Sequence, residues 1–145
     1  MTVPFEVVTP DRVVLETEVE MVSLRGGGGE LGILPRHTPL SATVKPGLIK
    51  IKFPEGEDYM VVASGFIQVL PTRITLLVDT AETAAQIEVE RAERARDRAE
   101  RRLADNGPDL DAARATASRQ RALHRLEAVE LSTRNGEVLK QRGSV

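Results

Sequence analysis

The amino-acid composition changes abruptly near residue 80, and this change limits the folds open to the chain. Residues 1–80 hold seven of the eight prolines and most of the Val, Ile and Phe, whereas residues 81–145 are rich in Ala, Arg, Glu and Leu. The first composition is typical of strands and turns and the second of helices. We therefore predict an α+β chain with a β-structured domain at 1–80 and a helical domain at 81–145.

Short apolar runs separated by turn residues indicate strands in the first part. These runs are residues 3–7, 13–15, 19–24, 48–53, 59–69 and 74–78. The breaks carry Pro, Gly and Asp, as at Pro46-Gly47 and Pro54-Glu55-Gly56, which are residue types that tight turns favour. Strands recurring at roughly 8–12 residues with such turns predict a β-sandwich or a small barrel with one shared core.

The second part carries the spacing of two helices. Apolar residues three or four apart form a first stripe at Ala92, Ala95, Ala99 and Leu103. This helix should end near Asp105-Asn106-Gly107-Pro108, and Asp109 or Asp111 should cap the next one. A second stripe follows at Ala115, Ala122, Leu126 and Val129. The short connection predicts an antiparallel hairpin, followed by a frayed or loop-like tail over residues 132–145.

The helical stripes consist mostly of alanine. Small side chains let two helices approach closely, but each buries little apolar surface, at roughly 25 cal/mol per Å². A segment with few apolar contacts opens at a low free energy. The pattern is therefore compatible with a moving hairpin, and equally with a static one.

Composition excludes several classes of function. The net charge of -2 argues against nucleic-acid binding through bulk positive charge. The chain has no cysteine and only two histidines, His37 and His124, which removes thiolate catalysis and Cys- or multi-His metal sites. No apolar run approaches the roughly 18 residues of a membrane helix, and the first residues lack the features of a signal or transit peptide. We expect a cytosol-like location, with membrane association only through a partner.

Two small features near the middle of the first part have alternative interpretations. Gly26–Gly29 lacks the Lys-Ser/Thr of a phosphate-binding loop, so a turn between strands is favoured over nucleotide chemistry. His37 is accompanied by no nucleophile arrangement, which favours a structural or interface histidine over a general base.

Arginines form the stronger signal, because they recur at helical spacing in both helices. The first helix carries Arg91, Arg94, Arg98 and Arg101, and the second carries Arg114, Arg121 and Arg125. In a hairpin these faces could converge on a polyphosphate, which planar guanidinium groups bind well. The alternative, favoured by the residues alone, is a solvated face with ion pairs such as Glu90–Arg94 and Asp97–Arg101.

Several motifs resemble those of the epsilon subunit family of bacterial and chloroplast F-type ATP synthases. The most specific segment is Gly29–Leu40, which fits the pattern Gly-Glu-x-Gly-x-x-x-x-His-x-Pro-Leu. Phe5–Pro10, Ser64–Val69 and Val78–Glu82 fit at the expected spacing, and the resemblance runs to about Leu131. It implies a β-sandwich followed by an α-helical hairpin, in agreement with the composition.

The resemblance implies a non-catalytic rotor subunit rather than an enzyme. The sandwich is expected to bind the gamma subunit and the ring of membrane c subunits, and so to help couple proton-driven rotation to ATP synthesis. Glu30 and His37 match the family segment that faces these partners. The resemblance places the chain peripherally at the cytoplasmic face of a bacterial plasma membrane, in preference to the chloroplast thylakoid.

The resemblance also makes the hairpin a regulator. Extended, it is expected to enter the alpha/beta catalytic head and block ATP hydrolysis; folded on the sandwich, it relieves inhibition and in several relatives binds ATP. The ATP motif Ile/Leu-Asp-x-x-Arg-Ala aligns with Ile87-Glu88-Val89-Glu90-Arg91-Ala92, so Glu88 replaces the motif aspartate. The implied ATP-binding residues are Glu82, Ile87, Glu88, Arg91, Ala92, Arg98, Arg121 and Arg125. ATP is implied as a regulatory ligand only, with no required cofactor and no metal site.

The side chains of these residues have different implied roles. Arg98, Arg121 and Arg125 would approach the phosphates, while Glu82, Ile87 and Glu88 would hold the adenine and its neighbouring groups. Glu88 keeps the charge of the motif aspartate but adds a methylene, which moves the carboxylate by about 1 Å and can cost a well-aligned hydrogen bond.

The alternative function for the whole chain is a free-standing protein-interaction adaptor, and an enzyme is a third and weaker hypothesis.

Overall fold

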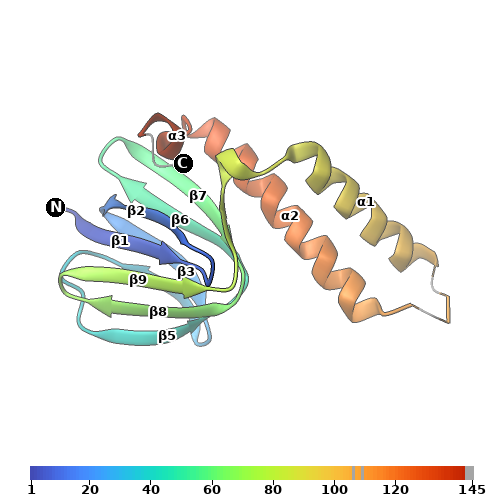
Figure 1. Ribbon diagram of the computed structural model, residues 1–145, viewed down its shortest axis with the longest axis horizontal. Helices are drawn as coiled ribbons and strands as arrows, with labels where there is room; N and C mark the ends of the chain where they lie inside the picture. Colours follow the sequence, from blue (N-terminus) through green and yellow to red (C-terminus); the bar gives the residue numbers. More distant parts are fainter. Residues whose placement is uncertain (106, 109, 143–145) are drawn as a thin grey trace.

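The structure, a computed structural model, describes residues 1–105, 107, 108 and 110–142. Ten strands come first: β1 Val3–Val8, β2 Val13–Val19, β3 Met21–Gly26, β4 Gly29–Ile33, β5 Leu40–Val44, β6 Gly47–Phe53, β7 Gly56–Val62, β8 Gly65–Leu70, β9 Arg73–Val78 and β10 Ala81–Thr83. A short 3₁₀ turn, η1 (Ala84–Gln86), leads to the helices α1 (Val89–Asp105), α2 (Ala112–Arg134) and α3 (Val138–Gln141). Figure 1 shows the strands forming one body, from whose side the α1–α2 hairpin projects.

The strands form one hydrogen-bonded path that folds over into a sandwich. Its order is β10-β7-β6-β3-β5-β8-β9-β1-β2, with β4 paired to β3, and the β1–β9 pair is parallel. Residues at alternate positions of these strands fill the space between the layers, among them Phe5, Ile51, Ile67 and Leu76, each 1% exposed or less. The predicted α+β class, a β-sandwich followed by a helical hairpin, is confirmed.

Two parts of the predicted strand pattern differ from the structure. The run 59–69 is two strands, because β7 ends at Val62 and β8 begins at Gly65. β4, β5 and β10 have no counterpart in the prediction: β4 contains Gly29 and Gly32, and glycine weakens the strand signal, while β10 pairs with β7 inside the part predicted to be helical. The Gly26–Gly29 turn is confirmed, since Gly26 and Gly29 face each other across the β3–β4 hairpin.

The predicted antiparallel helical hairpin is confirmed, and local signals set its ends. α1 ends at Asp105, as the Gly107-Pro108 signal predicts, and Asp111 caps α2 by accepting a hydrogen bond from the Arg114 backbone N–H at 3.0 Å. Asn106 and the alternative cap Asp109 lie outside the described residues. The helices meet through small residues, since the buried positions include Ala92, Ala99, Ala115, Ala122 and Ala128.

The predicted frayed tail over 132–145 is wrong for the part that the structure describes. α2 continues to Arg134, and α3 then turns back onto the sandwich, where Val138 and Leu139 are 4% and 2% exposed. The reversal uses two residues with positive φ, Gly136 at +89° and Glu137 at +51°. Asn135-Gly136 does mark a turn, but the apolar pair that follows it is buried in the core. Residues 143–145 lie outside the described part.

The single tyrosine supplies a pH-dependent probe of the sandwich. Burial raises the pKa of the Tyr59 phenol above its ordinary value of 10.0, and the nearby Glu57 carboxylate raises it further. Lys50, 3.4 Å from Glu57, acts in the opposite direction. A raised pKa in the folded state means that the stability contribution is present below about pH 10 and is lost as the pH rises through the raised value.

We therefore expect the phenolate absorbance of the folded chain to titrate at higher pH than that of the denatured chain. The chain has one Tyr and no Trp, so a single transition is observed. Glu57→Gln should lower the folded midpoint without returning it to the denatured value, because burial remains. Coincident midpoints for folded and denatured protein would contradict this prediction.

Candidate functional site

A cleft between α2 and the edge of the sandwich gathers several of the predicted ligand residues. Its volume is about 580 Å³, and its lining includes Glu82 from β10, Arg121, His124 and Arg125 from α2, and Arg25 and Lys45 from the sandwich. Three of the eight residues implied to bind ATP, Glu82, Arg121 and Arg125, are thus brought together from separate parts of the chain.

An ion pair spans this cleft and joins the hairpin to the sandwich. Arg125 Nε donates to Glu82 Oε1 at 2.8 Å, and the two side chains are 34% and 32% exposed. Partial exposure means that solvent screens the pair, so its contribution to docking is about 1 kcal/mol or less. The pair therefore orients α2 against β10 more than it stabilises the contact.

The other basic side chains of the cleft are not neutralised by acids. Arg121 Nη2 donates to the Ser118 hydroxyl at 3.0 Å. Within the described part of the chain, Arg25, Lys45 and Arg121 form no ion pair. The cleft is therefore cationic, and its chemistry favours an anionic ligand.

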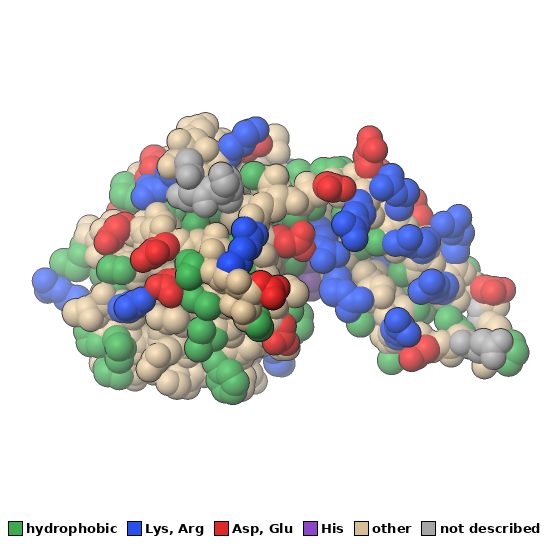
Figure 2. All heavy atoms as spheres, viewed as in Figure 1, with side chains coloured by type: hydrophobic (Ala, Val, Ile, Leu, Met, Phe, Trp, Pro, Cys, Tyr) green, Lys and Arg blue, Asp and Glu red, His purple; other side chains and the backbone are tan. Residues whose placement is uncertain are grey.

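The remaining residues of the implied ATP site do not line this cleft. Ile87 is half-buried just after η1, and the Glu88 carbonyl accepts from the Ala92 N–H at 3.0 Å where α1 begins. Ala92 is 3% exposed in the helix contact, whereas the side chains of Arg91 and Arg98 are exposed on α1. Figure 2 shows the Lys and Arg side chains gathered over the hairpin.

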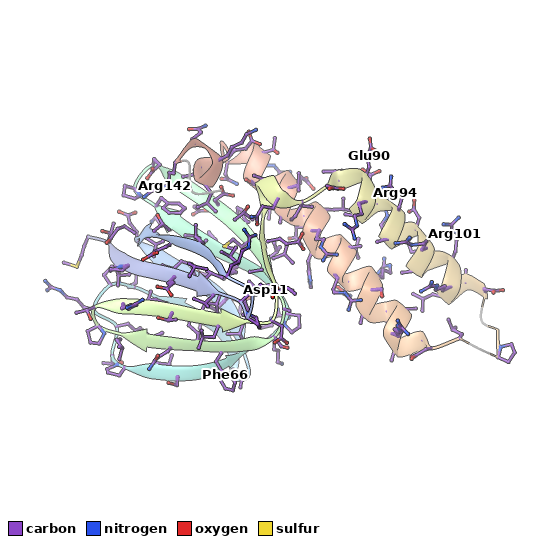
Figure 3. The ribbon with its side chains drawn as sticks, in the orientation of Figure 1. Asp11, Phe66, Glu90, Arg94, Arg101 and Arg142 are labelled. Carbon is purple, nitrogen blue, oxygen red and sulfur yellow. The ribbon has the colours of Figure 1, made fainter. Side chains whose placement is uncertain are left out.

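The outer edge of α1 carries a second set of charges. Glu90, Arg94 and Arg101 lie along this edge, away from α2 (Figure 3). The predicted Glu90–Arg94 pair is present at 4.0 Å. Asp97 pairs with Arg96 at 3.2 Å, and the predicted Asp97–Arg101 pair is not among the ion pairs of the described residues.

Glu30 and His37, predicted at a rotor interface, lie on and after β4. Glu30 is exposed near the start of β4 and lines a second cavity of about 670 Å³ between the sandwich and α2. His37 lies in the loop that follows, with Nδ1 2.7 Å from the Thr38 carbonyl oxygen. Arg36, beside it, has a φ of +62°, which is uncommon for a residue with a side chain.

The sandwich also carries exposed apolar side chains that were not predicted from the sequence. Phe66 on β8 and Leu77 on β9 face each other in register and are 59% and 46% exposed; Figure 3 labels Phe66 at the edge of the sandwich. Leu34, in the loop after β4, is 56% exposed. Phe66 and Leu77 stand at positions of β8 and β9 that alternate with the buried ones. This alternation was the sequence signal that could have predicted their exposure.

Two further observations concern membrane-spanning helices and clusters of metal ligands. No helix in residues 1–105, 107–108 and 110–142 is long and apolar enough to cross a bilayer. The same residues contain no group of three or more His, Cys, Asp or Glu side chains that could hold a metal ion. The described residues form a sandwich that exposes apolar side chains and carries a helical hairpin beside a cationic cleft.

Comparisons with known proteins identify the family. The model for the beta-sandwich domain of the ATP synthase Delta/Epsilon chain matches residues 2–84, and that for the long alpha-helix domain of the same chain matches residues 85–130. The ATP synthase epsilon chain of Bacillus cytotoxicus is 44% identical over 126 residues, which cover 87% of this chain and 95% of that relative. The epsilon chain of Moorella thermoacetica is 44% identical over 124 residues, covering 85% and 92%.

A solved structure agrees on the fold. A chain in the Euglena gracilis mitochondrial ATP synthase, in a structure of OSCP, F1 and c-ring, superposes with a TM-score of 0.62 at 22% identity, covering 89% of this chain and 78% of that one. The chain belongs to the ATP synthase delta/epsilon chain family, as an epsilon-type, non-catalytic subunit of the central stalk.

Proposed function

We propose that this subunit binds the gamma subunit and the c-subunit ring through its sandwich and so helps couple c-ring rotation to ATP synthesis. The exposed apolar side chains of Phe66 and Leu77, which lie opposite each other on β8 and β9, support this proposal, because adjacent apolar groups on a protein surface mark protein contacts. Glu30 and His37 are assigned to the same interface. These contacts would hold the subunit at the cytoplasmic face of a bacterial membrane, indirectly through its partners.

The hairpin is proposed to inhibit ATP hydrolysis by leaving the sandwich and entering the alpha/beta catalytic head. The observation that carries this proposal is the cleft itself. Beside the part of α2 that packs on β7, a cleft of about 580 Å³ separates α2 from the sandwich, and the half-exposed ion pair Arg125–Glu82 bridges it among the described residues. A contact of this kind can be broken at low cost compared with a packed apolar interface.

ATP is the proposed ligand of the folded hairpin. Arg121 and Arg125 in the cleft, with Arg98 on α1, supply cations for the phosphates, and Glu82, Ile87, Glu88, Arg91 and Ala92 complete the proposed site. A ligand that binds only the folded form stabilises it in proportion to RT ln(1 + [L]/Kd). ATP would then hold the hairpin down and relieve inhibition when its concentration exceeds the Kd.

Removal of residues 85–145 tests the inhibitory role of the hairpin. We expect the shortened subunit to bind gamma and to lose its inhibition of ATP hydrolysis in the reconstituted synthase, because the inserting segment is missing. Retained gamma binding shows that the sandwich is folded and thereby serves as the control. Full inhibition by the shortened chain would refute the hairpin mechanism, and failure of the full chain to bind gamma would refute the rotor assignment.

A further inference from the structure

The C-terminal segment attaches the hairpin to the sandwich in a way that the rest of the hairpin does not. This segment, residues 135–142, contains α3 and lies beyond residues 85–130, which the helical family model matches. Val138 and Leu139 belong to the same apolar cluster as the sandwich core, including Phe53 and Met60. Figure 1 shows α3 against the top of the sandwich, at the end of α2 that is far from the hairpin turn.

A buried carboxylate holds α3 in this position. Asp58 on β7 is 2% exposed. Its Oδ2 accepts from the Leu139 backbone N–H at 2.8 Å, and its Oδ1 accepts from the Tyr59 N–H at 2.7 Å. Because a buried polar group without a partner is costly, withdrawal of α3 would leave Asp58 short of one hydrogen bond and would uncover the core beside it.

Arg142 makes three further contacts across the rim of the sandwich. Its Nη1 lies 2.7 Å from Glu55 Oε2, and its Nη2 donates to Thr17 Oγ1 at 3.3 Å. Its guanidinium carbon lies 4.4 Å from the centre of the Phe53 ring, within the range of a cation–π interaction. A single side chain at the C-terminal end of α3 thus contacts β2, β6 and the β6–β7 turn.

Residues 135–142 attach to the sandwich through larger apolar side chains than the rest of the hairpin does. α1 and α2 meet through alanines, and the cleft is bridged by one half-exposed ion pair. Residues 135–142 instead place two large apolar side chains in the core. α2 also packs along β7, but its buried residues are small (Ala115, Ala122, Ala128 and Ser132), so the fully buried large apolar side chains that attach the hairpin lie beyond α2, in α3.

We propose that residues 135–142 form a C-terminal clasp that keeps α2 docked on the sandwich, so that the hairpin is released only when α3 leaves the core. The regulatory consequence rests on the proposed function, in which the released hairpin is the inhibitory one. The clasp sets how often that release happens, independently of ATP.

The clasp is tested on the full chain by measuring the distance between spin labels at Glu16→Cys and Thr116→Cys, the second of which lies on α2 outside the cleft. Both positions are exposed and the native chain has no cysteine, so labelling is specific. In the native background we expect one distance population, that of the docked hairpin. Leu139→Ala should raise the undocked population about 30-fold or more, from the usual cost of truncating a buried leucine.

Two more variants show whether an effect of Leu139→Ala reflects release of the clasp or loss of the fold. Arg142→Ala changes no core residue and should raise the undocked population about 3- to 10-fold, whereas Lys140→Ala, on the exposed side of α3, should leave it unchanged. Unaltered distances in both Leu139→Ala and Arg142→Ala would overturn the clasp. So would an equal effect of Lys140→Ala.

Inhibition of ATP hydrolysis by the same variants separates this inference from the proposed function. We expect Leu139→Ala and Arg142→Ala to inhibit more strongly than the native subunit. If the distances change and inhibition does not, the clasp stands and the inhibitory role of the hairpin fails. If inhibition by the native subunit is normal and the distances do not change, the clasp alone fails.

Discussion

Gly65→Ala is expected to destabilise the chain by about 3 kcal/mol or more, or to prevent folding. A Cβ at this position would lie 2.0 Å from the Leu77 carbonyl oxygen and 2.7 Å from the Val78 Cα. Both are backbone atoms of β9, the strand that pairs with β8, and Gly65 stands opposite Val78 in that pairing. A flexible side chain could move aside, but a strand fixed on both edges cannot.

Gly28→Ala is the matched control, because a Cβ there meets nothing within 4 Å. We expect its free energy of unfolding in urea to stay within about 0.5 kcal/mol of the native value. The comparison separates the steric effect of the close approach between β8 and β9 from the general effect of replacing glycine by alanine. Similar unfolding midpoints for the two variants would show that β8 and β9 do not approach as closely as the structure indicates.

Removal of both cleft arginines, Arg121→Ala with Arg125→Ala, should weaken ATP binding more than any other change on the hairpin. Each side chain can give charge-assisted hydrogen bonds to phosphate, and each such contact is worth about 1.5–3 kcal/mol. The expected loss of affinity is therefore about 10- to 100-fold for each substitution. Isothermal titration calorimetry of the full chain with ATP measures it directly.

Arg119→Ala controls for charge in this experiment. Arg119 lies on the same helix and pairs with Glu100 at 3.3 Å, and it does not line the cleft. Its removal changes the net charge by the same amount as either cleft variant. An equal loss of ATP affinity in Arg119→Ala, Arg121→Ala and Arg125→Ala would mean that ATP binding depends on the total positive charge of the hairpin. Tight ATP binding by the double variant would exclude the cleft as the phosphate site.

Features that depend on local chemistry were recognisable without the structure. The two helices, the stop at Gly107-Pro108 and the Asp111 cap all follow from propensity, period and capping, which act within a few residues. The Gly26–Gly29 turn belongs to the same group. The Gly29–Leu40 motif was sufficient to indicate the family.

Features that depend on contacts between distant segments required the folded chain. The run 59–69 divides because its two halves pair with different strands: β7 pairs with β6 and β10, whereas β8 pairs with β5 and β9. The segment 135–142 appears loop-like in isolation, and Val138 and Leu139 become core residues because β6 and β7 leave room beside Asp58. Arg25 and Lys45 likewise join Arg121 in one cleft only after α2 docks. Helix and turn signals are short-range, whereas burial and the assembly of charges arise from tertiary packing.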